Sequence, residues 1–163
     1  QAEVLYLLAK KTDIDVILAG STLEDWRRVF PYIEPPRNLH IMGRGFGDDL
    51  LEKLYRNARV VVIPITFLSI SNRLLEALFY GKSTITTIYA KYLHPELIHG
   101  KHVYITDNFV EDIVRLLRNE YMLKVLEQGA KEAYARFFST KHNVEVVRRL
   151  INFSKDVTYL TSR

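Results

Sequence analysis

The sequence predicts an α/β domain built on a doubly wound parallel sheet. Short apolar runs rich in β-branched residues alternate with helical patterns along nearly the whole chain. Its 163 residues also suit a single core. Connections between parallel strands are right-handed and usually helical, so helices should cover both faces of the sheet. We therefore expect one such domain over residues 1–163.

Five segments have the pattern of buried strands. They are residues 13–20, 38–42, 59–64, 83–88 and 102–106. The third reads RVVVIP, with four consecutive β-branched residues before a proline, and we expect it near the centre of the sheet. The first reads DIDVILAG, and its continuous apolar run predicts burial on both faces.

Helical patterns fill the segments between the strands. A helix opens the chain, and others are expected over about 23–30, 48–57, 74–81, 108–118, 120–137 and 139–153. Ser21 and Glu24 have capping-box spacing before the second helix, and Gly81 has the position of a C-terminal cap. Since a helix comes first, we expect a strand and its loop to precede Gln1 in a longer chain.

Composition excludes several classes of function. The absence of Cys removes disulfides, zinc–thiolate sites and cysteine nucleophiles, and it is compatible with a reducing compartment. No apolar run reaches the roughly 18 residues that span a bilayer. The net charge is +4 with dispersed basic residues, which argues against nucleic acid. It fits an anionic small molecule or an anionic membrane surface, but an ordinary soluble surface explains so modest an excess better than either. We expect a cytoplasmic protein, with peripheral membrane association left open.

Three patterns that suggest a site have simpler structural explanations. The glycine-rich turn at 43–47 lacks the spacing of the dinucleotide fingerprint. Residues 81–83 read GKS but leave a helix, whereas a P-loop enters one. His94, His99 and His102 have no supporting Cys or acidic cluster, so we interpret them as surface-loop histidines.

The segment 66–83 gives the strongest indication of a binding site. Ser69, Ser71 and Asn72 lie at the start of a helix after the predicted central strand, and Arg73 lies in its first turn. Polar caps, free backbone amides and a cation can bind a phosphate at such a position. A cation there opposes the helix dipole unless an anion compensates it. A capped helix with a solvated arginine explains the same residues equally well.

Three longer stretches resemble the C-terminal, donor-binding domain of retaining glycosyltransferases with the GT-B fold. They are NLHIMGRGFGDDLLEKLYRNARVVVIP, LLEALFYGKSTITT and LLRNEYMLKVLEQGAKEAYARFFSTKHNVEVVRRLI. The resemblance implies a Rossmann-like domain that binds a nucleotide sugar, as part of a longer two-domain chain. It also implies transfer of a hexose, without a metal ion or cofactor, to a glycan, lipid or small-molecule acceptor held by an N-terminal domain. This part alone should be inactive.

The same resemblance implies site residues. Family members carry two glutamates separated by seven residues, and Glu76 matches the second, which binds the nucleotide ribose. Leu68 stands where the first is expected. Gly43 and Arg44 match the turn beside the base, and Gly20 matches the end of the second strand.

Some assignments stay open at this stage. Arg73 is the local candidate to stabilise the departing diphosphate, and no residue has the pattern of a paired nucleophile or base. An ion pair between Glu76 and Arg73 at i,i+3 would explain the glutamate without a ligand. Because of Leu68, the alternative function is a non-catalytic domain of the same fold that serves in binding or assembly. A flavodoxin-like regulatory domain is disfavoured because no acidic cluster follows the first strands.

Overall fold

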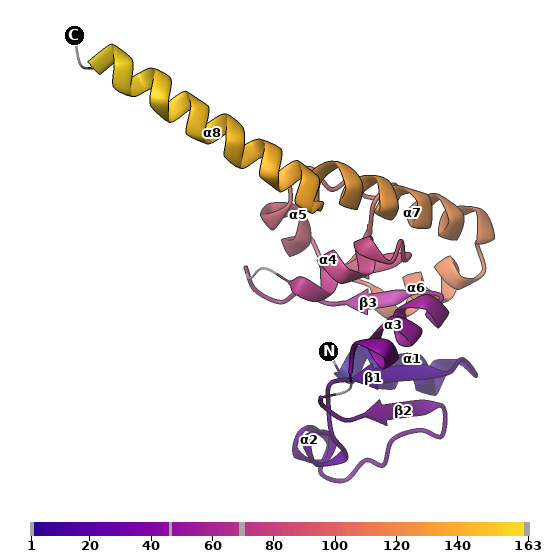
Figure 1. Cartoon of the computed structure of the whole chain (residues 1–163). Coiled ribbons are helices and arrows are strands. Elements are labelled where there is room, and N and C mark those ends of the chain that lie inside the picture. Colours follow the sequence, from indigo (N-terminus) through magenta and orange to yellow (C-terminus); the bar gives the residue numbers. More distant parts are fainter. Residues whose placement is uncertain (1, 46, 69–70, 162–163) are drawn as a thin grey trace.

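The computed structural model describes residues 2–45, 47–68 and 71–161 (Figure 1). The strands are β1 (Val16–Ala19), β2 (Leu39–Met42), β3 (Val61–Ile63), β4 (Thr84–Thr86) and β5 (Tyr104–Ile105). The helices are α1 (Ala2–Lys11), α2 (Leu23–Val29), α3 (Asp48–Asn57), α4 (Asn72–Phe79), α5 (Tyr89–Leu93), α6 (Phe109–Leu117), α7 (Glu120–Ala133) and α8 (Thr140–Thr161). A π-helical turn, η1 (Tyr134–Phe138), joins α7 to α8. The predicted alternation of strands and helices is confirmed, and only the short α5 was not expected.

The strands are parallel, but they form two sheets. One sheet has the order β1-β2, and the other has the order β3-β4-β5. The parallel class is therefore confirmed, whereas the prediction that residues 59–64 lie at the centre of the sheet is wrong. β4 is the middle strand of its sheet and is buried throughout, while β3 lies at the end because no described strand pairs with its second edge.

Two apolar layers lie on opposite sides of the strands. The first, here called the α1–α6 layer, joins α1 and α6 to residues from both sheets, and it contains Leu8, Ala9, Val16, Leu18, Trp26, Leu39, Ile85, Phe109 and Ile113. The second joins β3 to α4 and α7, with Leu74, Leu78 and Ala130 fully buried. Helices on both sides of β3-β4-β5 confirm the doubly wound architecture.

Strand β1 is buried on one face only, which corrects the prediction of burial on both. Val16 and Leu18 face the α1–α6 layer, whereas Ile17 is 46% exposed and Ala19 is exposed too. Successive side chains of a strand point to opposite faces, and α1 covers only the first of these.

Local capping fixes the ends of α2 and α4. The capping box of α2 uses Thr22 and Asp25, one residue later than the predicted pair Ser21 and Glu24. Thr22 has extended backbone geometry, and its Oγ1 accepts from the Asp25 amide at 3.1 Å while Asp25 Oδ2 accepts from the Thr22 amide at 2.9 Å. The predicted cap at Gly81 is confirmed by its φ of +63°.

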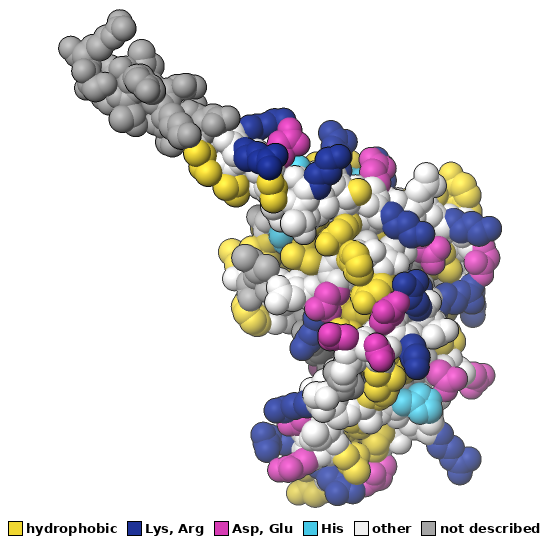
Figure 2. All heavy atoms as spheres, in the orientation of Figure 1, with side chains coloured by type: hydrophobic (Ala, Val, Ile, Leu, Met, Phe, Trp, Pro, Cys, Tyr) yellow, Lys and Arg dark blue, Asp and Glu magenta, His cyan; other side chains and the backbone are white. Residues whose placement is uncertain are grey.

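Helix α8 leaves the body of the domain (Figure 1). Its described first half exposes Val144 and Val147 beside Lys141 and Arg148, and Figure 2 shows this mixture of apolar and basic side chains where α8 begins. Among the described helices, none combines the length and apolarity required to cross a membrane.

Gly129 allows α7 to approach the loop before β5. A Cβ at this position would lie 1.9 Å from the backbone oxygen of Lys101, which cannot move as a flexible side-chain end would. We expect Gly129→Ala to destabilise the fold by about 1 to 3 kcal/mol, although alanine is the better helix former. Urea unfolding measures this change. The matched control is Gln128→Ala, at an exposed position on the same helix, and equal stability of the two variants would contradict the close approach.

Candidate functional site

Several candidate residues lie where parallel strands end. Gly20 directly follows β1 with a φ of +82°, and its amide donates to the Met42 oxygen at 3.0 Å. Gly43 directly follows β2 and has open space where a side chain would stand. In parallel sheets the carboxyl ends of strands form one edge, which is the usual place for ligands. Figure 1 shows the arrows of β2 and β3 pointing to the same side, where α4 also begins.

The first turn of α4 presents polar groups at this edge. Ser71 is the N-cap, and its Oγ accepts from the Leu74 amide at 3.4 Å. Asn72 and Arg73 are exposed, and among the described residues no carboxylate pairs with the Arg73 guanidinium. Ser69 lies outside the described residues. The structure places Ser71 at the N-cap and Asn72 and Arg73 in the first turn of α4, and their role as a binding site stays a prediction.

Glu76 is held by a tyrosine that the sequence analysis did not identify. The hydroxyl of Tyr55, on α3, donates to Glu76 Oε2 at 3.0 Å. The Tyr55 ring is 8% exposed and stacks on Tyr80 with ring centroids 5.0 Å apart. The expected alternative, an ion pair between Glu76 and Arg73, is not formed.

The electrostatics of this pair keep Tyr55 a neutral donor. Burial raises the pKa of the Tyr55 hydroxyl, and the hydrogen bond to the Glu76 carboxylate raises it further. One carboxylate oxygen of half-buried Glu76 is thereby fixed. Oε1 accepts no hydrogen bond from any residue in the described ranges, so the arrangement offers a positioned, charged acceptor.

The Arg44 side chain is held by a carboxylate near the start of α2. Its Nη2 donates to both carboxylate oxygens of Asp25, at 2.9 and 2.8 Å. Hydrogen bonds from Thr22, and then the Arg44 guanidinium, lower the pKa of Asp25. The structure therefore gathers the predicted residues in two groups, one at the ends of β1 and β2 and one on α4.

The tripeptide 81–83 has structural contacts. Lys82 Nζ donates to the Arg56 backbone oxygen at 2.8 Å, and Ser83 Oγ donates to the Leu123 oxygen at 2.9 Å. These contacts, together with the cap at Gly81, account for all three residues without a phosphate.

The predicted surface histidines are only partly at the surface. His99 is exposed and accepts from the Ile105 amide at 2.9 Å. His102 is 2% exposed and accepts from the Ile98 amide, so the surface assignment is wrong for it. Burial lowers the pKa of His102, which favours the neutral ring. Within the described ranges, no three His, Asp or Glu side chains gather as a metal site would require.

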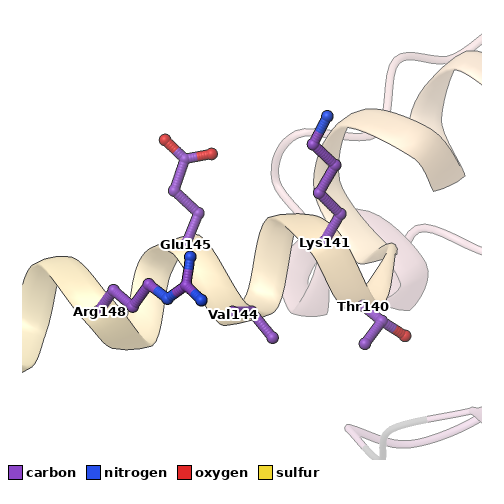
Figure 3. Close-up of a pocket in the computed structure, with 5 residues that line it drawn as sticks. All are labelled: Thr140, Lys141, Val144, Glu145 and Arg148. Carbon is purple, nitrogen blue, oxygen red and sulfur yellow. The ribbon is translucent and has the colours of Figure 1, made fainter.

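A shallow hollow on α8 is not part of this arrangement. Its lining consists of Thr140, Lys141, Val144, Glu145 and Arg148. Figure 3 shows that all of them come from one helix and project in different directions. Side chains of a single exposed helix do not converge on a ligand, so the carboxyl edge of the strands is the better candidate.

The position of Tyr55 could be predicted only in part. Leu51 and Tyr55 are four residues apart on a helix that was correctly predicted, and this spacing favours one buried face. The partner could not be inferred, because Glu76 lies 21 residues further along the chain.

Comparison with known proteins identifies relatives of the chain. A model of the family described as glycosyl transferases group 1 matches residues 2–119. None of the curated proteins matches. Among solved structures, the crystal structure of Anabaena Alr3699/HepE in complex with UDP is similar, with a TM-score of 0.73 and 15% sequence identity. The match covers 92% of this chain and 44% of that one, so the chain spans less than half the length of HepE.

The hydrogen bond between Tyr55 and Glu76 should contribute measurably to stability. We expect Tyr55→Phe to lower the free energy of unfolding by about 1 to 2 kcal/mol, because the bond is charge-assisted and partly buried. Tyr80→Phe is the matched control, since it keeps the stacked ring and its hydroxyl makes no hydrogen bond to a described residue. Urea unfolding at neutral pH compares the variants, and equal loss in both would contradict a specific role for the Tyr55 hydroxyl.

The contribution of Tyr55 should also depend on pH. Its folded pKa is raised, so the stabilisation is fully present below the ordinary tyrosine pKa of about 10 and is lost as the pH rises above it. The difference in unfolding free energy between wild type and Tyr55→Phe should therefore shrink between about pH 8 and pH 11. The other nine of the ten tyrosines are the same in both proteins, so the comparison isolates Tyr55. A difference that stays constant over this range would be inconsistent with the raised pKa.

Proposed function

The chain belongs to the glycosyl transferases group 1 family, and on this premise we propose that it is the nucleotide-sugar-binding domain of a glycosyltransferase. The fold is that of the C-terminal half of a GT-B enzyme. The observation that carries the proposal is the Glu76 carboxylate, which Tyr55 holds on α4 with Oε1 uncommitted. The transferred group would be a hexose.

Glu76 would bind the nucleotide ribose. Two vicinal hydroxyls are donors, and a carboxylate that is already ionised and positioned accepts from them without reorganisation. Tyr55 occupies Oε2 and leaves Oε1 for the ligand. Fixing one oxygen also reduces the side-chain entropy lost on binding.

Arg73 and the start of α4 would bind the diphosphate. The first amides of a helix lack intrahelical partners, and the exposed guanidinium of Arg73 adds a full positive charge beside them. As the sugar leaves, charge develops on the diphosphate, and these groups would stabilise it without a metal ion. The open turn at Gly43 would receive the base.

The rest of the enzyme would hold the acceptor. HepE is more than twice as long as the matched region, which supports an acceptor domain elsewhere in a longer polypeptide. HepE was crystallised with UDP, and this supports a uridine diphosphate donor here. The domain alone would transfer nothing, and the whole enzyme would act in the cytoplasm or at a membrane surface.

A second candidate is a binding domain that does not catalyse transfer. Leu68 replaces the glutamate expected near the donor sugar, and its side chain is 64% exposed on the loop before α4. A leucine cannot accept hydrogen bonds from sugar hydroxyls. Nucleotide binding without turnover by the longer polypeptide would favour this candidate.

Replacing Glu76 tests the ribose contact. We expect Glu76→Gln to weaken UDP binding by about 1 to 3 kcal/mol, roughly 5- to 150-fold in Kd, because a charged acceptor is lost while the shape is kept. Calorimetric titration with UDP and GDP measures the change. Glu132→Gln on α7 is the matched control, since it removes the same charge from a side chain that pairs with Lys101.

The control should bind UDP as wild type does. Equal, measurable affinity in wild type and Glu76→Gln would remove the ribose assignment. Equal weakening in both variants would indicate a general charge effect and not a contact made by Glu76.

A further inference from the structure

The neutral ring of His102 closes the loop that joins α5 to β5. Its Nδ1 accepts from the Ile98 amide at 3.2 Å, and the His102 amide donates to the Ile98 oxygen at 2.9 Å. An imidazole nitrogen accepts a hydrogen bond only where it carries no proton, so the proton of the neutral ring is on Nε2. The bond between the ring and the Ile98 amide therefore requires an uncharged His102.

The surroundings of His102 oppose a charge on the ring. The residue is 2% exposed, and its Nε2 has no hydrogen-bond partner among the described residues. A second proton, on Nδ1, would meet the Ile98 N–H, so that two donors would face each other where a hydrogen bond now stands. A buried charge without a partner is costly, so the closed loop is incompatible with a protonated ring.

Charged groups on the neighbouring elements also act on the ring. Burial lowers the pKa of His102 most, and Lys101 in the same loop and Arg136 of η1 lower it further. Glu132 of α7 and the Glu96 backbone oxygen have the opposite effect. The Glu132 carboxylate is already bound to Lys101 Nζ at 2.9 Å, however. The ring in the closed loop is therefore neutral at pH 7.

The closed loop supports α7 and η1. A Cβ at Gly129 of α7 would lie 3.3 Å from the His102 amide nitrogen, so the helix backbone lies directly on the loop. The His102 ring contacts Phe137 of η1 with ring centroids 6.2 Å apart, and the His94 ring contacts Phe138 at 5.1 Å. One residue separates η1 from α8, and Figure 1 shows the start of α8 beside α5 and the end of α7. The start of α8 thus rests on this loop.

We propose that His102 is a pH-sensitive latch, whose neutral ring holds residues 98–103 against α7 and η1 and whose protonation releases them. Release lets the charged ring bond with water and removes a contact of Phe137, so the start of α8 loosens from the domain. None of the residues assigned to the nucleotide takes part. The latch therefore goes beyond the proposed function and stands or fails independently of it.

The expected pH dependence follows from proton linkage. The opened loop exposes a histidine with the ordinary pKa of about 6.5, whereas the closed loop holds one with a lowered pKa. The open state therefore binds more protons below about pH 6.5, and the closed state becomes less favoured as the pH falls. A single proton changes this equilibrium by at most about tenfold per pH unit.

Hydrogen exchange of the loop amides tests the latch. In the chain of 163 residues, we expect the protection factors of the Ile98 and His102 amides to be constant above about pH 7.5. Below about pH 6.5 they should fall by up to about tenfold per pH unit. The Val61 amide, which donates to the Ser83 oxygen, is the internal control and should keep its protection. Ring nitrogen chemical shifts of His102, recorded on the same samples, report its protonation directly.

Two asparagine variants separate the latch from general effects of histidine charge. His102→Asn keeps an acceptor, Oδ1, close to the position of Nδ1 but cannot be protonated. Its loop protection should therefore not depend on pH between about 5 and 7.5. His40→Asn is the matched control, because His40 is an exposed histidine on β2 that pairs with Asp15. This variant should show the pH dependence of wild type.

Three results would overturn the proposal. Protonation of the His102 ring without loss of protection at the loop amides would show that the closed loop accepts the charge. Equal loss of protection at Val61 would indicate global unfolding and no separate release of the loop. The wild-type pH dependence in His102→Asn, or its absence in His40→Asn, would assign the effect to other groups. If His102→Asn does not fold, the first two results, both measured on wild type, still decide.

Discussion

Leu8 of α1 and Ile113 of α6 are buried in an apolar layer that reaches across both parallel sheets. The layer holds the two sheets together. The two-stranded β1-β2 pair depends on this contact, because so small a sheet is not stable alone. The layer also keeps the strands in one orientation, so that the carboxyl ends of β2 and β3 come to the same side as the start of α4 (Figure 1). The existence of a single carboxyl edge, and with it the candidate site, depends on this packing.

At that edge the chemistry rests on one fixed carboxylate. Tyr55 is buried in the second layer, where its ring stacks on Tyr80, and its hydroxyl therefore reaches Glu76 from a rigid position. The aromatic packing of α3 against α4 is thus linked directly to the geometry of the site. Arg73 lies three residues earlier on the same helix and remains exposed. The helix thus carries a cation and an anion near each other that form no ion pair with one another. Such a pair suits a ligand that has both phosphates and hydroxyls.

Local features of the fold were predictable from the sequence, and the long-range ones were not. The bounds of α3 follow from two aspartates after Gly47, and the cap at Gly81 follows from the end of an apolar helix. The short α5 was missed because it has only five residues, with no acidic residue in its first turn and no side-chain cap at Ile88. The edge position of β3 depends on which other strands pair with it. Its run of valines predicts a buried strand but does not predict the pairing partners. The contacts of Tyr55 with Glu76 and of Arg44 with Asp25 join residues about 20 positions apart, beyond the reach of helix or strand periodicity.

The central claim is that the carboxyl edge of the strands binds a nucleoside diphosphate. Backbone amide chemical shifts, recorded while UDP is added to the isotopically labelled chain, test it most directly because every element reports at once. The account predicts saturable shifts at Gly20, Gly43 and the first turn of α4, including Asn72 and Arg73, with α8 unaffected. Saturable shifts confined to α8, or no shifts at millimolar UDP, would contradict it.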